Sequence, residues 1–182
     1  MNADEIVFAR PKTTGVFFVG ATTATMPANA STAIDTSAFT ELGYVSDAGI
    51  VQTIDRSTTA LKDMGGDTVK ILDESHDVTY KLTPLQFNAD ILKELLGASN
   101  VTLSGTPAVL TSATVNSAPL SDRAFVFDML LSDTTPMRIV VPCGHISATG
   151  DMTFKAGQVL NAELTIDAMP DTSGNKAYYY FT

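Results

Sequence analysis

Residues 158–168 read QVLNAELTIDA and alternate apolar with polar side chains more regularly than the rest of the chain. One face of this stretch would carry Leu160, Ala162, Leu164, Ile166 and Ala168. The opposite face would carry Asn161, Glu163, Thr165 and Asp167. Successive side chains of a β-strand point to opposite faces, so a period of two predicts a strand with one buried and one polar face.

Turn residues divide the neighbouring sequence into further short runs of strand character. We expect strands at residues 15–24, 50–54, 68–72, 77–83, 108–115, 123–131, 137–141, 145–154 and 176–181. Glycine, aspartate and asparagine separate several of these runs, as at Asp47–Gly49 and Asp171–Asn175. Many short strands joined by turns are typical of a β-sandwich or barrel. The chain is therefore predicted to be mainly β.

One α-helix is expected at about residues 88–96. Asn88 is a favourable N-cap, and Asp90 lies in the first turn, where the helix dipole stabilises an acidic side chain. The apolar positions follow a helical period: Ile91, Leu92, Leu95 and Leu96. Gly97 is typical of a helix end. A helix this short persists only when its apolar face is packed, so we expect it to flank the sheet.

The 182 residues correspond to one domain with an arm. Residues 1–37 are expected to form an extended N-terminal arm with the first strand, and residues 38–182 the β domain. The polar stretch 55–67, which contains Gly65 and Gly66, is expected to form a long loop. Irregular segments of this length are usually functional or disordered, and the edge strands of an open sheet need cover. Both features favour self-association; the alternative is a monomer with mobile loops.

Acidic residues outnumber basic ones by 20 to 11, which gives a formal net charge of −9. Nucleic-acid binding through a basic face needs clustered lysine and arginine, and anionic membranes attract the same residues. We expect neither kind of binding. The longest apolar run, at residues 16–19, is too short to span a bilayer, and the acidic start has no signal-peptide pattern. These features predict a soluble protein made in the cytosol.

The sequence offers little material for catalysis. Cys143 is the single cysteine, and the histidines are His76 and His145. Cys143 and His145 are two residues apart, so both could point to one face of a strand, but no third residue completes a nucleophilic site. We interpret them as a small turn residue and a surface histidine. Since no nucleophile, metal or phosphate-binding motif is present, we expect no catalytic residue, metal or cofactor.

Four segments resemble, in the same order, the major tail proteins (tail tube proteins) of siphophages. The segments are 39–49 (FTELGYVSDAG), 61–69 (LKDMGGDTV), 78–83 (VTYKLT) and 88–97 (NADILKELLG). Two positions depart from the family pattern, because Met64 stands near a family tryptophan and Gln86 near a frequent glutamate. The resemblance covers about a third of the chain.

This resemblance implies a tail-tube-like β-sandwich or barrel with one flanking helix, assembled as stacked hexameric rings. The implied partners are further copies of the chain, the tape measure protein, and the tail terminator and tail tip proteins, with double-stranded DNA passing through. The implied location is the virion tail, after synthesis in the host bacterial cytoplasm. The long loop would contact neighbouring subunits and rings through Asp55, Arg56, Leu61, Lys62, Asp63 and Met64.

A channel that conducts DNA should not bind it. Every phosphate neutralised by a basic side chain adds affinity, whereas an acidic or neutral wall keeps the polymer mobile. The polar face of residues 158–168 carries no basic residue, so we expect Asn161, Glu163, Thr165 and Asp167 to line the channel. The alternative is that this face is ordinary solvated surface.

Three other classes of protein are weighed against this interpretation. The tube protein of a contractile tail or type VI secretion system is disfavoured by the pattern at 39–97. A β-sandwich adhesion or carbohydrate-binding module would use an exposed aromatic patch, for which Tyr178–Tyr180 is the candidate. An enzyme is disfavoured because no catalytic constellation is visible.

Overall fold

The computed structural model describes residues 7–12, 15–132 and 134–181, and β-strands dominate it. The strands are β1 (Ala9–Pro11), β2 (Phe17–Ala21), β3 (Phe39–Gly43), β4 (Val45–Lys62), β5 (Thr68–Pro84), β6 (Val101–Ser104), β7 (Val109–Ala113), β8 (Arg123–Leu131), β9 (Thr135–Thr149), β10 (Leu164–Ala168) and β11 (Tyr178–Phe181). The helices are α1 (Ala89–Leu96) and the 3₁₀ turn η2 (Ala98–Asn100). The predicted mainly β fold with one α-helix is confirmed.

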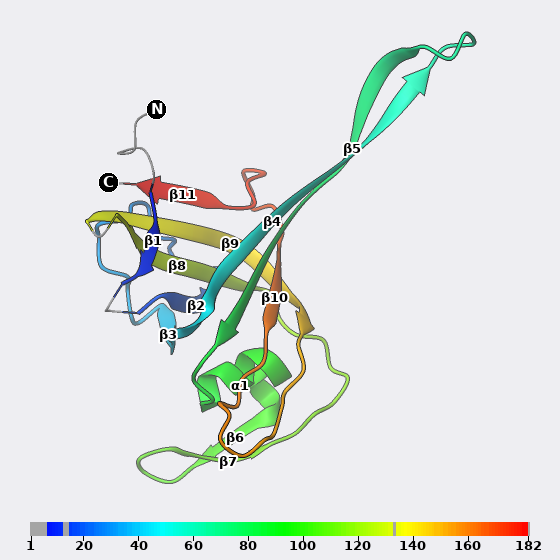
Figure 1. The fold of residues 1–182 in the computed structure, drawn as a ribbon. Helices are drawn as coiled ribbons and strands as arrows, with labels where there is room; N and C mark the ends of the chain where they lie inside the picture. The colour runs from blue at the N-terminus through cyan, green and yellow to red at the C-terminus, as the bar shows by residue number, and fades with distance from the viewer. Residues whose placement is uncertain (1–6, 13–14, 133, 182) are drawn as a thin grey trace.

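Nine of these strands form one antiparallel sheet in the order β3-β2-β8-β9-β10-β5-β4, with β1 on β8 and β11 on β9. The other two strands, β6 and β7, form a small separate hairpin (Figure 1). The large sheet curls strongly. Tyr80 of β5 and Phe127 of β8 are three strands apart, about 14 Å in a flat sheet, yet their ring centroids lie 5.4 Å apart. The two halves of the sheet therefore face each other across the core.

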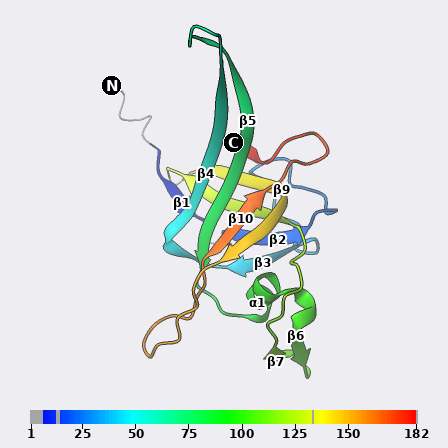
Figure 2. The same ribbon diagram turned by 90° about the vertical axis from the view of Figure 1, so that its right-hand side faces the viewer.

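The main core fills the inside of this curl. It is built from alternate side chains of β2, β8, β9, β5 and β10, and includes the stacked rings of Phe17, Phe125 and Phe127. Helix α1 closes one end of the curl (Figure 2) with Ile91, Leu92 and Leu95 buried. The predicted helix is confirmed, including its cap, because Asn88 Oδ1 accepts a hydrogen bond from the Ile91 N–H at 2.9 Å.

A second core lies on the outer face of β2, β3, β8 and β9, where residues 24–38 lie across the sheet. Phe18, Phe39, Val126 and Val140 are buried there, with Ile34 and other apolar side chains of the segment packed against them. The described part of the predicted N-terminal arm is thus held on the chain's own sheet. Residues 1–6, 13 and 14 of that arm lie outside the described residues.

The predicted long loop at residues 55–67 is wrong. Strand β4 continues to Lys62, and β5 begins at Thr68, so the only turn is at residues 63–67. In this turn Asp63 Oδ1 accepts hydrogen bonds from the N–H groups of Gly65 and Asp67 at 2.9 Å. The prediction failed because both faces of this stretch are exposed, so no apolar period marks it as strand.

Two further strand boundaries differ from prediction. The predicted breaks around Pro142 and at Cys143 do not occur, because β9 runs unbroken from Thr135 to Thr149. Pro142 lies between the part of β9 that pairs with β11 and the part that pairs with β10. Proline has no backbone N–H to donate, so it is tolerated at a strand position that has no hydrogen-bonded partner on that side. Residues 158–163 are not strand, and β10 begins only at Leu164.

Candidate functional site: the projecting hairpin and the polar sheet face

The outer half of the β4–β5 hairpin projects from the body as a two-stranded ribbon (Figures 1 and 2). Strand β10 pairs with β5 only from Val78 to Leu82, whereas β4 and β5 pair with each other out to Lys62 and Thr68. In the described structure, residues 55–62 and 68–77 therefore have sheet partners only within the hairpin. An isolated two-stranded ribbon is marginally stable in water, so this element gains from contact with another surface.

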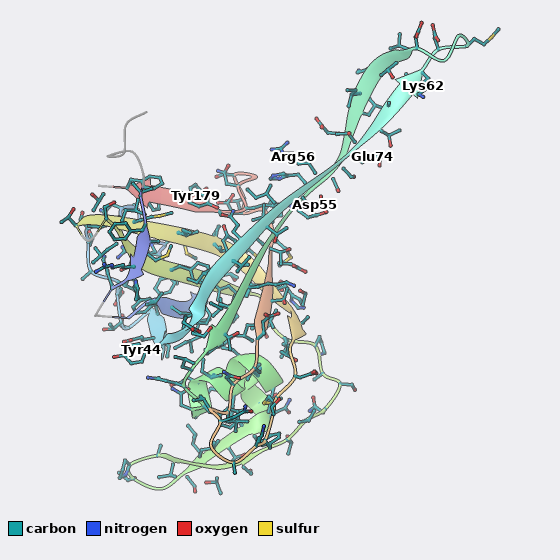
Figure 3. The ribbon with its side chains drawn as sticks, viewed as in Figure 1. Tyr44, Asp55, Arg56, Lys62, Glu74 and Tyr179 are labelled. Atoms are coloured by element: carbon teal, nitrogen blue, oxygen red, sulfur yellow. The ribbon has the colours of Figure 1, made fainter. Side chains whose placement is uncertain are left out.

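The six residues predicted to contact neighbouring subunits all lie on this hairpin. Asp55 and Arg56 are at its base, opposite Asp77 and His76, while Leu61 and Lys62 are near its end (Figure 3). Asp63 and Met64 belong to the end turn, where Met64 is fully exposed. The structure thus divides the predicted set into two groups at opposite ends of the ribbon.

Exposed apolar side chains distinguish the hairpin from an ordinary solvated loop. Leu61, Val69, Ile71 and Leu72 are between 43 % and 67 % exposed, and Ile54 near the base is 57 % exposed. Apolar side chains gathered on a projecting element are typical of a protein–protein contact. Sequence reasoning missed Val69, Ile71 and Leu72, although their place in a predicted strand next to a glycine turn was an available signal.

The polar face of β10 is the second candidate surface. Leu164, Ile166 and Ala168 are buried, so the alternation predicted for this strand is confirmed from Leu164 onward. Thr165 and Asp167 lie on the opposite, solvent-facing side, and Glu163, just before the strand, is exposed. Asn161 is half-buried in the irregular segment before β10.

Neighbouring strands extend this polar face and add charge of both signs. Asp167 lies opposite Thr79 of β5, whose hydroxyl donates to Asp167 Oδ1 at 3.0 Å. Two residues along, Thr165 lies opposite Lys81. Asp77 and Asp55 continue the same face towards the hairpin. The face therefore carries three aspartates. Lys81 is the basic residue beside β10, and Lys176 forms an ion pair with Asp77 at 3.6 Å.

Cys143 and His145 both lie within β9, so Cys143 is not the predicted turn residue, and His145 lies opposite Asp167 of this face. His145 Nδ1 is 2.8 Å from Asp122 Oδ1. Burial, and secondarily the charge of Asp122, raises the pKa of the Cys143 thiol, which disfavours the nucleophilic thiolate.

Among the described residues no group of three histidine, cysteine, aspartate or glutamate side chains could hold a metal ion. Nor does any described helix have the length and apolar character needed to cross a membrane.

The aromatic run Tyr178–Tyr180 has structural contacts on both of its faces. The rings of Tyr178 and Tyr180 stack at 6.3 Å and pack against the second core. The Tyr179 hydroxyl lies 3.0 Å from the hydroxyl of the fully buried Tyr80 (Figure 3 labels Tyr179). These rings therefore join β11 to the sheet, which weakens their interpretation as a glycan-binding patch.

Comparison with known proteins gives one family. A family model described as phage tail tube protein matches residues 1–182. No curated protein matches the chain. Among solved structures, the cap that terminates the tube of the anti-feeding prophage is similar over 100 % of this chain and 99 % of its own, at 11 % identity and a TM-score of 0.48.

A second similar structure is the sheath/tube terminator of an extracellular contractile injection system. It is matched over 93 % of this chain and 96 % of its own length, at 12 % identity and a TM-score of 0.43. Likeness at this level is too low to assign a function.

Proposed function

The chain belongs to the phage tail tube protein family, and on that premise we propose that it assembles with copies of itself into stacked rings that form the tube of a long phage tail. Its family makes it a structural protein of the virion tail. The proposal includes six subunits per ring and the transit of double-stranded DNA. It also includes the tape measure, terminator and tip proteins as partners.

The observation that carries the proposal is the projecting hairpin. It presents exposed apolar side chains on a ribbon that has no sheet partner among the described residues of its own chain. Burying apolar surface against a second copy would stabilise both the ribbon and the assembly.

The polar face of β10 with its neighbours is our candidate for the channel wall. Thr165 and Asp167, continued by Asp77 and Asp55, would present hydroxyl and carboxylate groups to the DNA, with Lys81 beside Thr165 and Lys176 paired with Asp77 as the neighbouring basic residues. Such a wall repels phosphate more than it binds it. A reconstruction of the assembled tube with Glu163 and Asp167 on its outer surface would overturn this part of the proposal.

A hairpin truncation tests the main claim. Replacing residues 57–75 with Asn-Gly joins the directly opposed pair Arg56 and His76 by a two-residue turn, so the rest of the sheet keeps its register. The control replaces residues 105–108 of the β6–β7 hairpin with the same turn, joining the opposed pair Ser104 and Val109.

We expect rings or tubes from the wild-type and control chains in negative-stain electron microscopy, and a folded monomer from the truncated chain. Circular dichroism and size-exclusion chromatography report the fold and the oligomeric state. The proposal fails if the wild-type chain remains a monomer, or if the truncated chain assembles as well as the wild type. A monomer that binds glycans would instead support the adhesion module.

A further inference from the structure

An apolar groove of about 400 Å³ lies between β1 and the start of β4. Its lining includes Ala9 and Pro11 of β1, residues 45–49 at the start of β4, and Met129 of β8. Its size falls within the ~300–1,000 Å³ typical of pockets that bind a ligand or a few side chains.

A bulge in β4 creates the groove. Val45 lies opposite Pro84 and Ile50 lies opposite Leu82, so residues 46–49 have only Thr83 across from them. The extra residues push outward from the sheet, as expected for a strand with inserted residues. Gly49 permits this course because its φ of 72° is unfavourable for other residues. The bulge is therefore built into the sequence SDAG at residues 46–49.

We propose that this groove receives the end of the β4–β5 hairpin, residues 61–67, from a second copy of the chain. The inference rests on the proposed self-assembly and names the surface that the hairpin contacts. Leu61 and the fully exposed Met64 would supply the apolar side chains that enter the groove. Methionine suits this role because its flexible side chain adapts to irregular apolar surfaces.

The contact must be between different copies. The groove lies at the beginning of β4 and the hairpin end lies at the end of the same strand, and Gly49 and Lys62 are about 44 Å apart at the usual rise per residue. A paired ribbon cannot fold back over that distance onto its own start, and it points away from the body (Figure 1). A projection that fits a different surface of an identical molecule gives head-to-tail contacts, which close into rings or continue as tubes.

Charge supports the same pairing. Arg10 and Asp47 lie beside the groove, while the hairpin end carries Lys62, Asp63 and Asp67. In the proposed contact, Lys62 of the hairpin end lies near Asp47 of the groove. Complementary charges of this kind fix the orientation of a contact and disfavour misaligned ones.

Reversing the charges tests this pairing. Asp47→Lys and Lys62→Asp should each raise the protein concentration needed for assembly by roughly tenfold, because each places like charges together. A chain with both changes should return to within about threefold of the wild type, because each groove again meets an opposite charge. Lys155→Asp, an exposed charge reversal in the 150–163 segment, is the control. Thermal melts confirm that each variant is folded.

Cross-linking gives a second readout. In a Cys143→Ser background, chains with Met64→Cys and chains with Ala48→Cys are mixed during assembly and treated with a short bis-maleimide. We expect a cross-linked dimer from this mixture, and none when Ser104→Cys on the β6–β7 hairpin replaces Ala48→Cys.

The outcomes separate the two proposals. Tubes that form without the 64–48 cross-link, or a double charge variant no better than the single ones, overturn the groove and leave self-assembly standing. A wild-type chain that never assembles overturns both.

Discussion

The guanidinium of Arg138 binds both carboxylate oxygens of Asp128, with Nε–Oδ1 and Nη2–Oδ2 distances of 2.6 and 2.8 Å. The pair lies between neighbouring strands β9 and β8 on the outer face of the sheet, and the Arg138 side chain is 1 % exposed. Nη1 of Arg138 also donates to the carbonyls of Asn29 and Thr32. One buried cation thus satisfies a carboxylate and fixes the irregular segment that covers the second core.

Replacing Arg138 with methionine should lower the free energy of unfolding by roughly 3–5 kcal/mol, because it leaves Asp128 buried with Lys12 as its remaining cation. Urea unfolding followed by circular dichroism measures this loss. Lys93→Met is the control: Lys93 and Asp90 are 31 % and 42 % exposed in their ion pair, so we expect a loss below about 1 kcal/mol.

A double variant, Asp128→Leu with Arg138→Met, should recover most of the stability lost in Arg138→Met, since a buried ion pair can often be exchanged for apolar side chains. It should still allow faster proteolysis within residues 24–37, which lose the hydrogen bonds to Asn29 and Thr32. A loss under 1 kcal/mol for Arg138→Met would show that the ion pair does not hold this face together.

The hydroxyl pair of Tyr80 and Tyr179 predicts an asymmetric result. Tyr179→Phe leaves the Tyr80 hydroxyl fully buried without its partner, which should cost about 1–3 kcal/mol. Tyr80→Phe leaves the Tyr179 hydroxyl on a side chain that is 39 % exposed, where water can replace the lost bond. We therefore expect Tyr80→Phe to cost less. Equal losses in thermal or urea unfolding would contradict this account.

Glycine at position 144 is predicted to be required by packing. A Cβ there would lie 2.9 Å from both Ile166 Cγ2 and Phe125 Cδ2, so Gly144→Ala should destabilise the fold by about 1–3 kcal/mol through overpacking. The expected sign is a lower melting temperature. Ala148→Val, four residues along the same strand and exposed, serves as control and should change stability little. A Gly144→Ala chain as stable as the wild type would mean that the side chains of Ile166 and Phe125 can shift at no cost.

The parts of the fold that sequence predicted are those where one face is buried. Strand β10 has buried Leu164, Ile166 and Ala168, and α1 has a capped apolar face, so their periods are visible in the residues themselves. The outer hairpin lacks a buried face, and its pairing from Asp55 to Lys62 follows instead from the short turn and from the strand it extends.

The missed parts of the candidate site depend on contacts distant in sequence. The groove joins β1 to a bulge in β4, and neither segment indicates the other. The buried pair of Arg138 and Asp128, which lies outside that site, could have been predicted more easily than the groove. Each is a charged residue within an apolar strand run, in MRIVV at 137–141 and FVFDML at 125–130. Opposite charges placed in two predicted neighbouring strands are a signal for a buried pair.

Acid should weaken the turn before β11 through Asp171. Its carboxylate accepts hydrogen bonds from the Tyr178 hydroxyl at 2.6 Å and from the N–H groups of Ser173 and Asn175, and these bonds lower the pKa of Asp171 below its ordinary value of 3.8. A lowered pKa in the folded state contributes stability above about pH 4, and that contribution is lost as pH falls through the folded value. Unfolding free energies measured between pH 6 and 2.5 should therefore fall less steeply for Asp171→Asn than for the wild type. Glu74→Gln, an exposed charge loss on the hairpin, is the control and should follow the wild-type curve. Identical slopes for the wild type and Asp171→Asn would show that this carboxylate does not stabilise the turn.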